Sequence, residues 1–284
     1  MDFYTLVIEK ESIIRLSFFL LTLFVMGSWE ITAPRRTPTI SKVSRWANNL
    51  GLVFINAFVL RLVFPLASTG VAMLAYERGW GILNYYDIST TIGIIIFIFI
   101  MDLTIYLQHV MVHAVPLFWR FHRVHHADLD YDTTTGIRFH TFEIVFSMFI
   151  KFTAIVLLGP AVIAVIFFEI ILNSAAMFNH GNVGLPKTVD KVLRWFIVTP
   201  DMHRVHHSIE EDETNSNFGF NLSIWDRVFG TYREKVRAGQ IDMIIGLKTI
   251  RKPKKTNFII GMLLIPFTGK IDRYVINSTN KKDK

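Results

Sequence analysis

The chain has 284 residues, of which 51% are hydrophobic and 25 are phenylalanine, and its mean hydropathy is +0.38. This composition is far more apolar than that of a soluble domain and predicts a membrane protein. The net charge of +7 gathers in loops and in the tail rather than on one helix face, so we expect no nucleic-acid partner. The sequence has no cysteine, which excludes iron–sulfur clusters, thiolate-ligated haem, cysteine-type zinc sites and disulfides.

Three apolar runs in the first part of the chain are each long enough to cross a bilayer as a helix. They extend from Ile13 to Trp29, from Leu50 to Leu66 and from Thr90 to Leu107. Glu9 and Glu11 precede the first run, where a secretory signal would carry basic residues. We therefore expect the first run to be a retained membrane helix.

Basic residues predict the orientation of these helices. The loop after the first run is rich in arginine and lysine, whereas the loop after the second run holds only one basic residue, Arg78. Because cytoplasmic loops carry an excess of basic residues, the first loop is predicted to be cytoplasmic, as is the stretch that follows the third run. The basic residues of the first loop are Arg35, Arg36, Lys42 and Arg45.

A fourth apolar stretch, Val145 to Phe178, is interrupted by Gly159 and Pro160. This pair ends helices, so the stretch is predicted to form a hairpin of two short helices whose ends return to the cytoplasmic side. The later apolar patch from Phe258 to Phe267 is too short to span and is predicted to lie against the membrane or to pack on the protein. The tail lysines, Lys281, Lys282 and Lys284, are predicted to be solvated.

All 10 histidines lie between His109 and His207, and their spacing is regular. His109 and His113 are four residues apart at the inner end of the third helix, so both rings project from one face. The pentapeptide His-Arg-Val-His-His occurs twice, at residues 122–126 and 203–207, and on a helix it places three rings on one side. Thr199, followed by a proline and an aspartate, predicts a helix start before the second copy.

Clustered imidazoles of this kind predict a metal site. Without metal they would repel one another on protonation and would leave many ring nitrogens without partners, whereas neutral imidazoles bind divalent cations directly. The number of rings exceeds what one ion can use, so two ions are predicted. Such ligands suit iron, zinc, copper or nickel, and the ligand set alone does not choose among them.

Several polar residues near the histidines are candidates for holding the rings. Asp102 precedes His109 by two helical turns and shares its face, and an acid inside an apolar helix is expensive enough to predict a functional partner. A carboxylate that accepts an imidazole N–H is one such partner, and an ordinary polar contact between helices is the other. The full set of these candidates is Asp102, Arg138, Glu143, Glu169, Asn173 and Asn179.

The pattern resembles the fatty acid hydroxylase and sterol desaturase family of membrane di-iron proteins. The three histidine boxes correspond to residues 109–113, 122–126 and 203–207, and the isolated His140 and His180 look like the family's isolated histidines. Residues 217–231 are similar to the segment that follows its last box. The resemblance covers roughly residues 90 to 232, and the family's fused electron-carrier domain is absent from the sequence.

The resemblance implies an all-α integral membrane protein with about four to five membrane helices and a cytoplasmic helical cap that holds a dinuclear metal site. It divides the chain into N-terminal membrane helices (1–89), a catalytic domain (90–232) and a basic C-terminal extension (233–284). All ten histidines are implied as ligands of two iron ions, for which zinc could substitute in purified protein: His109, His113, His122, His125, His126, His140, His180, His203, His206 and His207.

The implied activity is O2-dependent hydroxylation or desaturation of a fatty acyl chain, sterol or ether lipid from the bilayer. The sequence has no dinucleotide fingerprint, phosphate-binding loop or thiol pair, so we expect electrons to come from a separate cytochrome, ferredoxin or reductase. A bacterial inner membrane is favoured over the endoplasmic reticulum. Two alternatives remain open at this point: a metal-handling membrane protein, and a non-catalytic scaffold stabilised by zinc.

Overall fold

The computed structural model describes residues 3–269 and 274–276, and the tail lysines, Lys281, Lys282 and Lys284, lie outside the described residues. Helices account for the regular structure of this part of the chain, with three isolated β-bridges and no strand longer than a bridge. The long helices are α2 (Glu11–Thr32), α3 (Lys42–Val63), α6 (Thr90–Ala114), α8 (Thr141–Leu158) and α9 (Val162–Asn179). The short elements are α1 (Phe3–Glu9), α4 (Ser68–Glu77), α5 (Ile82–Tyr85), α7 (Pro116–His126), η1 (Thr135–Ile137), α10 (Lys187–Leu193), α11 (Pro200–His206), α12 (Glu211–Thr214), α13 (Ile224–Val228), α14 (Gly239–Asp242), α15 (Pro253–Thr256), α16 (Ile259–Leu264) and η2 (Ile265–Phe267).

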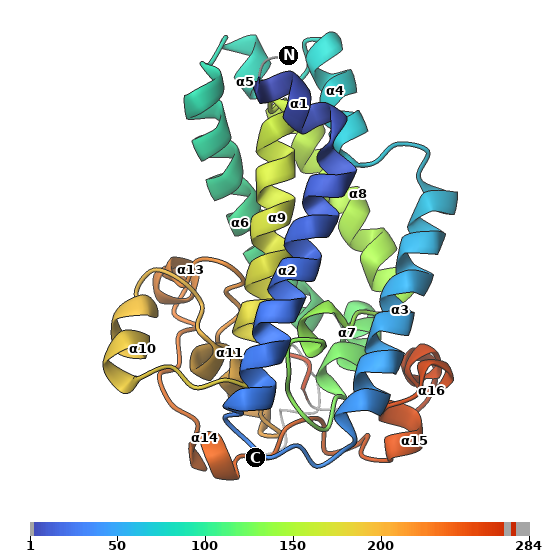
Figure 1. Ribbon diagram of the computed structural model, residues 1–284, viewed down its shortest axis with the longest axis vertical. Coiled ribbons are helices and arrows are strands. Elements are labelled where there is room, and N and C mark those ends of the chain that lie inside the picture. The colour runs from blue at the N-terminus through green and yellow to red at the C-terminus, as the bar shows by residue number, and fades with distance from the viewer. Residues whose placement is uncertain (1–2, 270–273, 277–284) are drawn as a thin grey trace.

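Five segments of the described chain are long and apolar enough to cross a membrane, which confirms the predicted helical membrane architecture. Four are α2, α6, α8 and α9, and the fifth begins with α3 and continues through α4 and α5. The long helices run side by side, with α9 at the centre and α1, α4 and α5 gathered at one end of the bundle (Figure 1). The short helices α7, α10, α11 and α14 to α16 lie toward the opposite end (Figure 1).

The predicted hairpin is confirmed as the pair α8 and α9, which meet at Gly159 and Pro160. Gly159 ends α8 with φ of +64°, a left-handed conformation that favours glycine. A Cβ at this position would lie 2.1 Å from the carbonyl oxygen of Trp80, so the turn also needs glycine for space. Both helices have 18 residues and belong to the segments that are long enough to span.

Two predicted helices extend further than their apolar runs. The helix predicted from Leu50 begins at Lys42, because Ser41 caps it by accepting a hydrogen bond from the backbone N–H of Ser44. The third predicted helix continues past the end of its apolar run at Leu107 to Ala114 and carries His109 and His113 in its last turns, as predicted. The first turns of α3 lie toward the end of the bundle that holds α7 and α14 to α16, and the last turns of α6 pack against α7 at the same end (Figure 1).

The predicted helices around the two pentapeptides are present as α7 and α11. In α11 the hydroxyl of Thr199 accepts a hydrogen bond from the N–H of Met202 at 3.4 Å, and Pro200 occupies the first helical position, as predicted. The apolar patch from Phe258 to Phe267 forms α16 and η2, which pack beside α3 and α7 with Met262 and Ile265 buried.

Candidate metal centre

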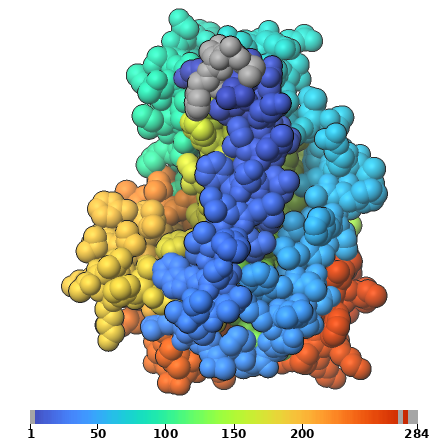
Figure 2. All heavy atoms as spheres, viewed as in Figure 1, coloured from blue at the N-terminus to red at the C-terminus, as the bar shows by residue number. Residues whose placement is uncertain are grey.

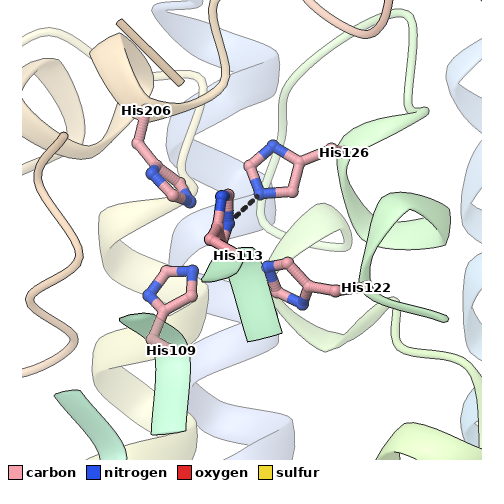
Figure 3. Close-up of side chains that lie close together, drawn as sticks. All are labelled: His109, His113, His122, His126 and His206. Atoms are coloured by element: carbon pink, nitrogen blue, oxygen red, sulfur yellow. Dashed lines mark hydrogen bonds between the residues drawn. The ribbon is translucent and has the colours of Figure 1, made fainter. Parts of the chain in front are cut away.

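Nine of the ten histidine rings meet in two adjacent groups at the end of the bundle where α7 and α11 lie. Within each group, one ring nitrogen from every residue lies within 4.8 Å of one from each of the others. Figure 3 shows the larger group converging from α6, α7 and α11. This five-ring group consists of His109, His113, His122, His126 and His206, and the four-ring group consists of His125, His180, His203 and His207.

Each copy of the repeated pentapeptide contributes to both groups. On α7, His122 and His126 face the five-ring group, whereas His125 faces the four-ring group. On α11, His206 belongs to the five-ring group, and His203 and the residue that ends the helix, His207, belong to the other. Two helices therefore hold the groups side by side, with the rings of His126 and His207 stacked at 4.6 Å between centroids.

Backbone carbonyl oxygens fix the orientation of four rings. The Nδ1–H of His109 donates to Phe218 O at 2.8 Å, that of His206 to Ser216 O at 2.8 Å, and that of His180 to Ala176 O at 2.8 Å. The Nδ1–H of His125 donates to Arg138 O at 3.3 Å. Because a carbonyl oxygen only accepts, the proton of each neutral ring is on Nδ1, and its Nε2 carries a free lone pair.

Side-chain oxygens orient two further rings in the same way. Oε1 of Glu143 lies 2.6 Å from Nδ1 of His122, and Oδ1 of Asn215 lies 3.2 Å from Nδ1 of His113. A ligand ring whose other nitrogen donates to a carboxylate or an amide oxygen has a fixed tautomer and a fixed angle.

Nε2 atoms face one another within the groups, and in the four-ring group one such pair has no proton with which to form a hydrogen bond. The Nε2 atoms of His125 and His180 lie 3.1 Å apart, although both rings carry their proton on Nδ1. Those of His113 and His126 are also 3.1 Å apart. Among the described residues, Nε2 has no hydrogen-bond partner in His109, His122 and His206.

Opposed lone pairs without protons are repulsive, and buried ring nitrogens without partners are rare. A cation placed between the rings removes both problems, so the residues fit one metal ion in each group. The nitrogen-only donor set suits iron, zinc, copper and nickel.

Burial keeps the rings neutral. It lowers the pKa of the imidazoles well below the usual range in His125, His126 and His180, and the neighbouring imidazoles lower it further. Burial lowers the pKa of His203, His206 and His207 in the same manner. Neutral rings have the lone pair that metal binding needs, so burial prepares the groups for a cation.

The structure does not bring His140 to either group. Its Nδ1 accepts the backbone N–H of Phe142 at 3.1 Å, which makes His140 the N-cap of α8, and its Nε2 lies 3.3 Å from Leu263 O. The sequence treats His140 and His180 alike as isolated histidines, and the fold separates them.

Three of the polar candidates have partners other than the rings. Asp102 accepts hydrogen bonds from Trp225 Nε1–H at 2.8 Å and from the N–H of Leu222 at 3.2 Å. Glu169 pairs with Arg15 at 2.8 Å, and Asn173 donates to the carbonyl oxygen of Glu169. Glu169 lies about three helical turns before His180, roughly 16 Å along the helix. In the described part of the chain, Asp102 and Glu169 are thus polar contacts between helices.

The other three candidates lie at the groups. Glu143 and the carbonyl of Arg138 hold rings as described above, and Asn179 precedes His180. The carbonyl oxygen of Asn179 accepts the hydroxyl of Tyr131 at 2.6 Å, and the Tyr131 ring stacks on His180 at 5.5 Å between centroids.

Asn215, Tyr131 and the carbonyl oxygens that hold rings were not predicted from the sequence. Asn215 follows the last histidine cluster closely, which is a weak signal, and a backbone carbonyl has no signal at all. A buried network at η1 was also not predicted from the sequence: Arg45 pairs with Asp128 at 2.7 Å and with Asp132 at 2.5 Å, and it donates to the hydroxyl of Thr135. This network ties the N-terminal end of α3 to the loop after α7.

Comparison with known proteins adds to this geometry. The family model described as fatty acid hydroxylase matches residues 94–231. The chain is 29% identical to alkylglycerol monooxygenase of Xenopus tropicalis, over 67% of this chain and 43% of that protein. It is 26% identical to ornithine lipid hydroxylase OlsE of Rhizobium tropici, over 77% of this chain and 63% of that protein. It is 23% identical to human cholesterol 25-hydroxylase over 47% of this chain and 48% of that protein.

The chain therefore spans less than two thirds of the length of each of these relatives. No solved structure matches it significantly. The matched residues, 94–231, include every ring of the two groups.

Proposed function

We propose that the protein is an O2-dependent oxygenase that hydroxylates or desaturates an alkyl C–H bond of a membrane lipid, because residues 94–231 match the fatty acid hydroxylase family model. The observation that carries this proposal is the pair of adjacent imidazole groups whose free Nε2 atoms face one another at the end of α6.

The two groups would each hold one iron ion. When bound, the ions would supply O2 activation and the power to attack an unactivated C–H bond. The contribution of the chain is to hold the rings before the metals arrive. Glu143, Asn215 and four backbone carbonyls fix the ring tautomers, and burial excludes water from the reacting volume.

The substrate would be the alkyl or acyl chain of a polar lipid. The Xenopus tropicalis relative named for an alkylglycerol and the relative named for ornithine lipid align with 67% and 77% of this chain, and the relative named for cholesterol aligns with 47%. A lipid chain needs no polar recognition in the membrane, and α6 leads from the apolar bundle directly to His109 and His113.

Electrons would come from a separate redox partner, which would meet the protein on the side of the metal centre. We propose that this side is cytoplasmic, in a bacterial inner membrane, because the basic loop between α2 and α3 lies there. Arg35 of this loop pairs with Asp201 of α11 at 3.0 Å, and Arg36 donates to Gln240 O at 2.7 Å.

Two measurements test the proposal. Purified protein should contain about two iron atoms per chain after loading with iron under reducing conditions. Cells that express it, grown under 18O2, should then contain a lipid with one added 18O atom, or one with two fewer hydrogens. The matched cells would express the His125→Ala variant. Bound metal with unchanged lipids in both cell types would favour a zinc-stabilised scaffold instead.

A further inference from the structure

A lobe beside the bundle exposes an unusual number of apolar side chains. The lobe is formed by α10, residues 194–197 and α13, and it stands out from the helices of the bundle (Figures 1 and 2). Phe196 is 66% exposed, Val228 62% and Trp195 60%. Other exposed apolar residues of the lobe are Val189, Val192, Ile224 and Phe229. A monomeric soluble surface seldom carries a patch of this kind, so the patch indicates a binding surface.

The lobe is one rigid unit rather than a set of loose loops. The hydroxyl of Ser223 donates to Arg194 O at 2.8 Å, and Ile197 and Leu222 form an antiparallel bridge. Asp226 is fully buried and accepts the N–H groups of Phe218 and Gly219 at 2.7 and 2.8 Å. The exposed side chains are therefore held in place on α13 and on residues 195 and 196.

The depth of the lobe follows from its contacts with α6, one of the candidate membrane spans. Trp225 packs on Phe99 at 4.7 Å between ring centroids, and Phe229 stacks on Tyr106 at 5.3 Å. Phe99 lies about four turns before the end of α6 at Ala114, roughly 22 Å along the axis, and the hydrocarbon core of a bilayer is about 30 Å thick. Since α6 crosses the membrane in the proposed arrangement, α13 lies at the depth of the acyl chains.

Polarity changes along the lobe in the direction expected at a membrane surface. In Figure 1, α13 sits higher than α10, next to α6, and α10 lies toward the metal-centre end. Lys187 and Lys191 of α10 are exposed. Between the two levels the Arg227 guanidinium lies 3.9 Å from the ring centroids of both Trp195 and Tyr232. Aromatic rings and basic side chains together are typical of the interface between acyl chains and head groups.

From these contacts we infer that the lobe is a membrane-inserted surface, with α13, Trp195 and Phe196 in the acyl chains of the leaflet on the metal side and Lys187 and Lys191 at its head groups. The patch is continuous with the outer face of α6, where Phe99 is 47% exposed. This inference uses the membrane orientation of the proposed function but not its chemistry.

The absence of cysteine makes the depth of single positions measurable. Phe196→Cys and Val228→Cys variants would each carry one nitroxide label in vesicles of phosphatidylcholine and phosphatidylglycerol. Relaxation by O2, which concentrates in lipid, would be compared with relaxation by a water-soluble chromium oxalate complex. Phe58→Cys on α3, at a side chain that is 66% exposed, is the lipid control. Lys235→Cys, at a side chain that is 82% exposed, is the control on the water side.

Labels at positions 196 and 228 are expected to respond as the label at position 58 does, with strong O2 and weak chromium effects. A strong chromium effect, as at position 235, would show that the lobe is in water and overturn the inference. Weak effects from both agents would show that protein covers the lobe and would also overturn it. Neither readout depends on bound iron or turnover, so failure of the proposed chemistry would leave the measurement unchanged.

Discussion

Oε1 of Glu143 lies 2.6 Å from Nδ1 of His122, so a carboxylate of α8 orients a ring of α7. His122 is thereby held with its Nε2 toward the five-ring group, and that Nε2 has no other partner among the described residues. The contact therefore joins the membrane hairpin to the candidate metal centre.

We expect Glu143→Ala to weaken metal binding at the five-ring group by about 10- to 100-fold, because His122 loses the partner that fixes its tautomer. Glu143→Gln should lose less, since its amide oxygen can still accept the Nδ1–H. Titration of the apoprotein with Fe²⁺ or Zn²⁺ measures the change. Glu169→Gln is the matched control, and an unchanged affinity in Glu143→Ala would mean that the contact only braces α7 against α8.

Alanine substitutions should distinguish the histidines of the two groups, which bind metal in the proposed arrangement, from His140, which lies outside both groups. His206→Ala is expected to lose at least one of the two metal ions, because it removes a ligand from the five-ring group. His140→Ala should keep both ions and lose only the N-cap of α8, at a cost of about 1 kcal/mol of stability. Metal analysis and thermal unfolding of both variants test this. Loss of metal from His140→Ala without unfolding would return His140 to the ligand set.

The histidines show which parts of the metal centre could be predicted from the sequence and which could not. The i, i+4 spacing of His109 and His113 and the repeated pentapeptide were enough to predict rings on one helix face, since that relation is local. His140 and His180 carry the same local signal, and only the packing of α8 and α9 distinguishes an N-cap from a ring of the four-ring group.

The partners of the polar candidates could not be predicted for the same reason, because they depend on packing between distant segments. Periodicity places Asp102 and His109 on one face of α6, but it does not say which loop comes to meet that face. The structure brings Trp225 and Leu222 to Asp102, from more than one hundred residues later in the chain. The carbonyls of Phe218 and Ser216 hold rings, although any residue type has a carbonyl.

Asp102 is therefore predicted to act on stability rather than on metal binding. Asp102→Leu leaves the N–H groups of Trp225 and Leu222 without an acceptor and should destabilise the protein by about 1–3 kcal/mol. Asp102→Asn keeps an acceptor oxygen and should lie closer to wild type. Thermal unfolding in detergent, with metal content measured on the folded fraction, tests both variants. Metal loss from a normally stable Asp102→Asn variant would instead support the role predicted from the sequence.

Metal removal should destabilise the fold, because four contacts between Nε2 atoms at 3.1–3.2 Å then lack a cation between them. A ligand that binds only the folded state stabilises it by about 4 kcal/mol at a thousand times its Kd. Apoprotein prepared with a chelator should thus unfold at a lower temperature than holoprotein, and Fe²⁺ or Zn²⁺ should restore the difference. Mg²⁺ should not, since it prefers oxygen ligands. The His203→Ala variant is the control, because its weakened four-ring group should reduce the restoration. Equal unfolding temperatures for wild-type apoprotein and holoprotein would mean that the rings are stable without ions, and the metal assignment would then be wrong.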